Sequence, residues 1–229
     1  MPSVEQAAAA LAVSSLPLLL PDSCALLDVV RGPSRLSTAE LRDALALLAE
    51  VTALPAACTL LLPSLVSREV TENLPMARAS LSKFIAQTNR GAALLHDLVT
   101  LLSQVRDPIV PFSQTLPNEL ESRVNRGIQS ASVLDREDRF DVLGMGRAVE
   151  RRRPARQGKA KDAVIVEEAL ELSRMLLALG HQQPRVFLTS NTADFCERGV
   201  LHPDLDPDFG AARLLFATRW DHARHLLGL

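Results

Sequence analysis

Five polar residues stand where a parallel α/β sheet places its functional crevice. Asp22 directly follows the first apolar run of the chain, and Glu69 lies one to two turns into the helix expected after a second run. Asn191 and Asp194 follow a third apolar run, and Asp162 opens a long helix. Because ligands of open parallel sheets bind beyond the carboxyl ends of the strands, we expect these side chains to share one crevice.

Four of these five residues are acidic, and carboxylates gathered in a partly desolvated crevice repel one another. Such clusters usually persist because a divalent cation neutralises them, and carboxylates without His or Cys favour Mg²⁺ or Mn²⁺ over Zn²⁺. We therefore expect Asp22, Glu69 and Asp162 to converge within reach of one cation. Taken singly, each of the five residues also fits a helix cap or a turn residue.

Short apolar runs alternate with amphipathic stretches along the chain, which predicts an α/β sandwich of three layers around a central parallel sheet. Each run is short and continuously apolar, as expected for strands that are buried on both faces. The predicted strands are Leu16–Ser23, Cys58–Leu62, Arg185–Thr189 and Arg213–Ala217.

The 229 residues are interpreted as a single domain with extra helices inserted. Residues 76–150 are predicted to form a helical insertion or lid, and the pattern from Met76 to Val105 is helical with one possible break at Gly91. Asn118–Val133 is predicted as a helix and Asp204–Gly210 as a loop.

Four segments of the chain resemble, in order, the conserved blocks of PIN-domain nucleases. LLLPDSCALLD supplies Asp22 and Ser23, LLPSLVSREV supplies Glu69, and KDAVIVEEAL supplies Asp162. VFLTSNTADF, the fourth block, supplies Thr189, Asn191, Asp194 and Phe195. Two positions depart from the usual pattern: Cys24 stands where the family often has Asn, and Asn191 where many active members have Asp. The chain is similar to a longer subgroup with Asn in that fourth block.

The resemblance implies a PIN-like fold and a metal-dependent phosphodiesterase, in particular a ribonuclease that uses a metal-activated water. It implies that Asp22, Glu69, Asp162 and Asp194 bind Mg²⁺ or Mn²⁺, Asp194 directly or through water. Asn191 would be a neutral ligand or would orient the water. Ser23 would bond a carboxylate of the site or the scissile phosphate, and Thr189 would contact the substrate. The implied partners are RNA and either an antitoxin-like protein, as in toxin–antitoxin pairs, or a second copy of the chain.

The segment Arg147–Lys161 carries seven basic residues and one acid, Glu150. One interpretation is a mobile arm that contacts phosphates beside the acidic crevice. The other is a solvated loop, as charge runs usually are. The candidate phosphate contacts are Arg151, Arg152, Arg153 and, next to Asp162, Lys161.

Three alternatives remain beside a nuclease. A haloacid-dehalogenase-like phosphatase also has an Asp at a strand end, but it needs a second acid two residues later, where this chain has Cys24. A PIN-like module that binds nucleic acid or protein, with weak or lost catalysis, is kept open by Asn191. A purely structural α/β protein would show no response to metal.

Composition excludes several other classes. The chain has no Tyr and eight aromatic residues in all, which argues against folds that stack bases on aromatic platforms. It has no GxxxxGK[ST], GxGxxG or GxSxG motif. Three cysteines without a Cys-x-x-Cys pair predict reduced thiols. The apolar N-terminal run has no preceding Lys or Arg and is too short to span a bilayer, so we expect a cytoplasmic protein without a membrane association.

Overall fold

The central sheet has five strands, and all of them are parallel. This computed structural model describes residues 1–103, 110–155 and 160–229. The strand order is β3-β2-β1-β4-β7, with Leu18 of the central strand paired to Thr59 on one side and Arg185 on the other. The strands are β1 (Leu18–Pro21), β2 (Thr59–Leu62), β3 (Ser132–Val133), β4 (Arg185–Leu188) and β7 (Leu215–Ala217).

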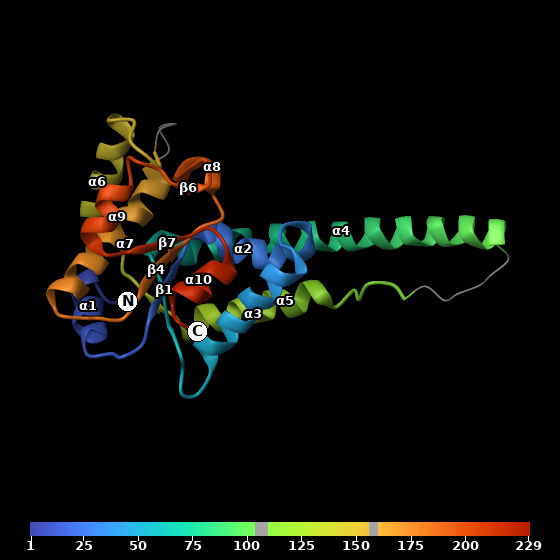
Figure 1. The fold of residues 1–229 in the computed structure, drawn as a ribbon, viewed down its shortest axis with the longest axis horizontal. Helices are drawn as coiled ribbons and strands as arrows, with labels where there is room; N and C mark the ends of the chain where they lie inside the picture. The colour runs from blue at the N-terminus through green and yellow to red at the C-terminus, as the bar shows by residue number, and fades with distance from the viewer. Residues whose placement is uncertain (104–109, 156–159) are drawn as a thin grey trace.

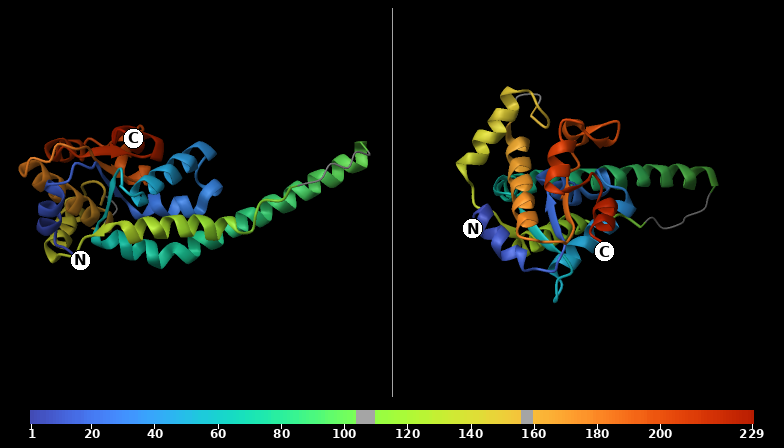
Figure 2. Two further views of the ribbon diagram at one scale, coloured as in Figure 1. Left: turned by 90° about the horizontal axis from the view of Figure 1, so that it is seen from below. Right: turned by 60° about the vertical axis from the view of Figure 1, so that its left-hand side comes forward.

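Helices cover both faces of the sheet, as Figures 1 and 2 show. One layer contains α1 (Val4–Ala12), α6 (Asp138–Val149), α7 (Ala160–Ala178) and α9 (Asp206–Ala212). The other contains α2 (Ser23–Arg31), α3 (Thr38–Thr52), α4 (Ser64–Ser103), α5 (Leu116–Ser130) and α10 (Trp220–Leu226). The predicted three-layer α/β sandwich with a parallel sheet and additional helices is therefore confirmed, in a topology consistent with a PIN-like fold.

The apolar strands are buried because both of their faces are covered. Leu19 and Leu20 of β1 and Leu61 of β2 have no exposed surface, so each strand lies inside one continuous hydrophobic core. This is why a central parallel strand reads as an unbroken apolar run rather than as an alternating pattern. The four predicted strands are present, each shorter than its predicted range, and β1 has half the predicted length.

Two elements differ from the prediction because they are very short. Asn118–Val133 was predicted as one helix, but α5 ends at Ser130 and Ser132–Val133 pairs with β2 as the edge strand β3. Asp204–Gly210 was predicted as a loop, but α9 runs from Asp206 to Ala212. Phe209 and Ala212 are buried there, so the packing of this seven-residue helix outweighs its turn-like composition.

The predicted break at Gly91 is absent, because α4 is one continuous helix of 40 residues. It even contains Pro75, whose ring removes one backbone hydrogen bond. The helix persists there because Leu74, Ala77 and Leu81 on either side pack into the core. The predicted range continues to Val105, and its last two residues lie outside the described residues.

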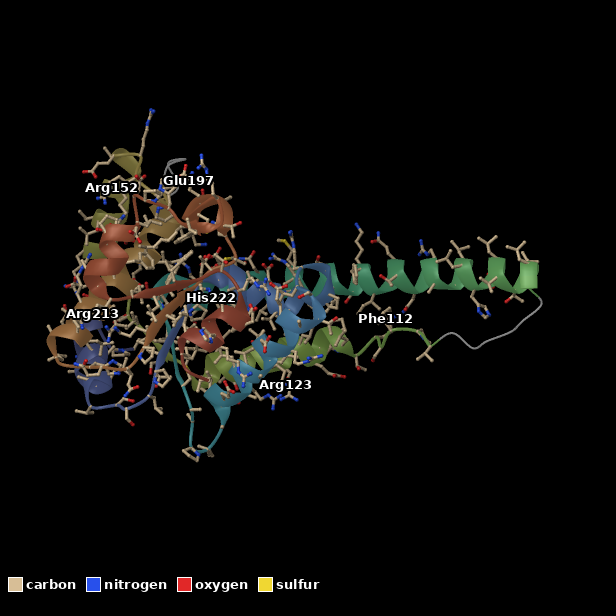
Figure 3. All side chains as sticks on the ribbon, viewed as in Figure 1. Phe112, Arg123, Arg152, Glu197, Arg213 and His222 are labelled. Carbon is tan, nitrogen blue, oxygen red and sulfur yellow. The ribbon has the colours of Figure 1, made fainter. Side chains whose placement is uncertain are left out.

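The distal part of α4 extends away from the rest of the molecule (Figure 1). The segment that leads back to α5 is hydrogen-bonded to it, because the Asn89 amide oxygen accepts from Phe112 N at 2.9 Å and Asn89 Nδ2 donates to Phe112 O at 3.2 Å. Figure 3 labels Phe112 beside this part of α4. The range 76–150 also supplies strand β3, so part of it belongs to the central sheet.

Three shorter elements complete the fold: the 3₁₀ turn Gly32–Ser34, α8 (Thr192–Phe195), and a small antiparallel pair of β5 (Cys196–Glu197) with β6 (Val200–Leu201). Among the described residues, no helix has both the length and the apolar character needed to cross a membrane.

Candidate functional site

Asp22 lies at the carboxyl end of the central strand and caps the helix that follows it. Its backbone N–H donates to Leu188 O of the neighbouring strand at 2.7 Å, and its side chain accepts from Ser23 N at 2.6 Å. The Thr189 hydroxyl donates to Asp22 Oδ2 at 2.9 Å, and the Cys24 thiol donates to the same oxygen at 3.1 Å. Burial raises the pKa of Asp22 above its ordinary value, and these donors oppose that rise.

Glu69 reaches this strand end from α4. Ser23 Oγ donates to Glu69 Oε2 at 2.7 Å and also contacts Asp22 Oδ1 at 3.3 Å, so one hydroxyl joins two carboxylates. Lys161, the second residue of α7, forms an ion pair with Glu69 Oε1 at 2.6 Å. The prediction that Ser23 bonds a carboxylate of the site is confirmed in geometry.

Asp162 and Asp194 are joined by the amide of Asn191. Asn191 Nδ2 donates to Oδ2 of Asp162 and to Oδ2 of Asp194, at 3.0 Å in each case. Asn191 N also donates to Thr189 Oγ1 at 3.1 Å, which links this group to Asp22. The five predicted residues therefore share one crevice beyond the carboxyl ends of β1 and β4.

The carboxylates are close enough to influence one another. Burial raises the pKa of Asp162 to about 6, and the negative charges of Asp22, Asp194 and Glu69 add to that rise. The ammonium group of Lys161 opposes it. The site therefore brings several carboxylates close together. Ionising Asp162 there costs more free energy than ionising it in water.

The convergence of Asp22, Glu69 and Asp162 on one cation stays a prediction. Within 1–103, 110–155 and 160–229, no group of three or more His, Cys, Asp or Glu side chains is placed to hold a metal ion. The hydroxyl of Ser23, the amide of Asn191 and the ammonium of Lys161 occupy the carboxylate oxygens instead. The side-chain oxygens that could bind a metal here belong to carboxylates and one amide, and oxygen ligands of this kind suit Mg²⁺ or Mn²⁺.

Thr189 was predicted to contact substrate, and the structure corrects this. Its side chain has no exposed surface, and its hydroxyl is used to bond Asp22 and Asn191. A fully buried hydroxyl positions the acidic group rather than touching a bound ligand. Ser23 is also nearly buried, whereas Lys161 is exposed at the rim of the crevice.

The basic segment is not a free arm where the structure describes it. Arg147 belongs to α6 and is buried, with its guanidinium paired to Glu167 and Asp208. Arg153 donates to Ala193 O at 2.8 Å and lies 3.6 Å from Asp194 Oδ1. Both the mobile-arm and the solvated-loop interpretations are therefore wrong for these two arginines, because packing and ion pairs hold them.

The other predicted arginines keep more of their surface. Arg151 is exposed in the turn after α6, and Arg152 is half-exposed, 3.3 Å from Asp208 Oδ2. Figure 3 labels Arg152 at the α6 end of the molecule. Residues 156–159 of the segment lie outside the described residues.

Two residues complete the site in roles that the sequence did not predict, since Cys24 was noted only as a departure from the family pattern and Arg153 only as a phosphate contact. Cys24 contacts both Asp22 and Thr189, and burial raises the pKa of its thiol to about 12, so it acts as a neutral donor. Arg153 provides a positive charge beside Asp194. Cys24 could have been found from its position in the first turn after Asp22, but the contact of Arg153 depends on a fold-back that no local pattern reveals.

Comparison with known proteins adds no relative to this description. No protein-family model, no curated protein and no solved structure matches the chain.

Proposed function

We propose that the protein is a PIN-like, metal-dependent phosphodiesterase that cleaves RNA in the cytoplasm with Mg²⁺ or Mn²⁺. The observation that carries the proposal is the meeting of Asp22, Glu69, Asp162 and Asp194 at the carboxyl edge of a parallel sheet. Burial and neighbouring carboxylates raise the pKa values of Asp22 and Asp162 there. A crevice of this kind is the place where an open α/β sheet binds its ligand.

Each residue of the site would have a role that follows from its position. Asp22, Glu69 and Asp162 would hold the metal, with Asp194 as a further or water-mediated ligand. The bound metal would supply an activated water and would offset the charge on the leaving oxygen. Thr189 and Ser23 keep the carboxylate of Asp22 in place, and the Asn191 amide holds Asp162 and Asp194 at equal distance.

Lys161 gives the site an internal counter-charge in the arrangement observed. Its ammonium occupies Glu69 Oε1, the oxygen that a metal would need. With Glu69 holding a metal, the exposed ammonium of Lys161 would instead be available to bind a phosphate of the substrate. Arg151 and Arg152, which are exposed, would contact phosphates further along an RNA strand.

One set of observations favours a second function, that of a PIN-like binding module with weak or lost catalysis. Asn191 provides an amide where an acid would strengthen metal binding, and the described residues present no assembled group of three metal ligands. Such a module would bind RNA or a protein partner, for example an antitoxin-like protein, through the same crevice without cleaving a bond.

Cleavage of labelled single-stranded RNA separates the two functions. The wild-type chain is compared with Asp22→Asn and with Asp206→Asn, an exposed control acid in the first turn of α9, each with Mn²⁺ and with EDTA. We expect cleavage that requires Mn²⁺, that falls at least about 100-fold in Asp22→Asn, and that is unchanged in the control. Stabilisation of the folded chain by Mn²⁺ without any cleavage would contradict the enzyme and support the binding module.

A further inference from the structure

The distal part of α4 carries a large apolar surface. Five leucines there, each between 55 and 87% exposed, are Leu94, Leu95, Leu98, Leu101 and Leu102. Both views in Figure 2 show this part of the helix projecting beyond the body of the molecule. Contiguous exposed apolar surface of this kind usually marks a binding site on a soluble protein.

These leucines form one face of the helix, which we call the leucine face. At about 100° per residue they fall within half of the helix circumference, with Gly91 among them. Asn89, which bonds the returning segment at Phe112, is nine residues from Leu98 and therefore lies on the opposite side, about 180° away. The segment that leads back to α5 is therefore bonded to the side of α4 opposite the leucine face, and among the described residues it leaves that face uncovered.

The leucine face continues a stripe that is buried in the body. Leu74, Leu81, Leu95 and Leu102 follow one another at multiples of seven residues. The first two are buried, Leu74 in the main core and Leu81 against Leu120 of α5. The stripe that packs α4 onto its own chain is therefore exposed in the distal part of the helix, where it is available to pack against another helix.

We propose that the leucine face binds the leucine face of a second copy of the chain, with the two α4 helices antiparallel. Together the five leucines expose the equivalent of about three and a half side chains. At about 120 Å² of apolar surface for each, two copies would bury about 800 Å² from these residues alone. That is close to the apolar share of a standard protein–protein interface.

The distribution of small and large residues fits this pairing. Gly91 lies at one end of the leucine face, and Leu102 lies at the other. In a two-fold contact that sets Leu95 opposite Leu98, Gly91 of each copy faces Leu102 of the other. The largest gap in the face then meets a large side chain at each end of the contact, as close packing requires.

Gly91 has no role inside its own chain that would explain it. A glycine within a helix lowers helix stability relative to alanine. A Cβ atom built at Gly91 meets nothing within 4 Å, so the described chain does not require the missing side chain there. The close approach of Leu102 from a second copy would explain why a glycine stands at this position. This inference does not depend on the proposed function.

Sedimentation equilibrium of the full chain tests the contact. We expect the wild-type chain to have twice its mass of 24.9 kDa at micromolar concentration. Leu98→Glu should weaken the association at least about 100-fold, because each dimer would bury two carboxylates. The matched control is Ala93→Glu, which adds the same charge to the exposed opposite side of the helix and should leave the association unchanged.

The substitution Gly91→Leu distinguishes the specific antiparallel contact from non-specific hydrophobic association. It adds apolar surface and helix propensity, so unspecific association would become stronger. The proposed pairing would become weaker, because the new side chain would collide with Leu102 of the second copy. A monomeric wild-type chain, a dimer that survives Leu98→Glu, or a dimer strengthened by Gly91→Leu would each overturn the proposal, the first leaving the face to a different partner.

Discussion

Replacing Asp162 by Asn measures how much the acidic crevice costs the folded protein when no metal is bound. The pKa of Asp162 is raised from its ordinary value of 3.8 to about 6 by burial and by the carboxylates of Asp22, Asp194 and Glu69. Two pH units correspond to about 3 kcal/mol between the two protonation states. Asn keeps an oxygen that can accept from Asn191 Nδ2 but carries no charge.

The sign of the effect follows from the direction of the shift. Below pH 4 Asp162 is protonated in both the folded and the unfolded chain, so its charge contributes nothing. Between pH 4 and 6 the unfolded chain has lost the proton and the folded chain still holds it, so stability falls as the pH rises. Above pH 6 the full cost applies, and Asp162→Asn removes it.

Urea unfolding in EDTA, from pH 4 to pH 8, provides the assay. We expect Asp162→Asn to match the wild-type chain near pH 4 and to exceed its stability by about 3 kcal/mol at pH 7.5. Asp206→Asn, at the exposed start of α9, controls for the loss of a negative charge at a helix N-terminus. A variant that is less stable than wild type at pH 7.5, or a difference that does not change with pH, would refute the reasoning.

Two further substitutions test how the crevice and its supporting helices are held. Thr189→Val removes the hydroxyl that donates to Asp22 at 2.9 Å. We expect the free energy of unfolding in urea to fall by about 1.5–3 kcal/mol at pH 7.5, and by less in acid, where Asp22 is protonated. A loss that does not change with pH would contradict this. Gly144→Ala brings a Cβ to 2.8 Å from the backbone N of Val164 and should cost at least about 2 kcal/mol in thermal unfolding. Gly146→Ala, which meets nothing within 4 Å in the same helix, should be neutral or stabilising by up to about 1 kcal/mol, and equal effects of the two would contradict the packing of α6 on α7.

The sequence allowed the fold and the membership of the crevice to be predicted because both depend on local signals. Buried parallel strands are continuous apolar runs, and the end of such a run places the next polar residue at a known edge of the sheet. Asp22 directly follows β1 and Asn191 lies three residues beyond β4, so their meeting could be predicted from the strand ends alone. Even Glu69, which comes from a helix, is placed within one or two turns of a strand end.

The remaining features depend on contacts between distant segments. Strand β3 consists of two residues and exists because β2 offers it a partner, which no window of sequence contains. The continuity of α4 through Pro75 comes from packing on both sides of the proline. The bonding of Glu69 has the same origin, since Ser23 and Lys161 contact its two oxygens from positions 46 and 92 residues away in the chain.

The charges of the crevice are arranged in two tiers. Glu69 and Asp194, the outer acids, each have a cation beside them, Lys161 and Arg153. Asp22 and Asp162, the inner acids, are bonded by neutral donors among the described residues, and burial raises the pKa of both. A cation entering the crevice would therefore gain most at the two inner acids, and only Lys161 need move to admit Glu69, since Arg153 is also fixed by Ala193 O.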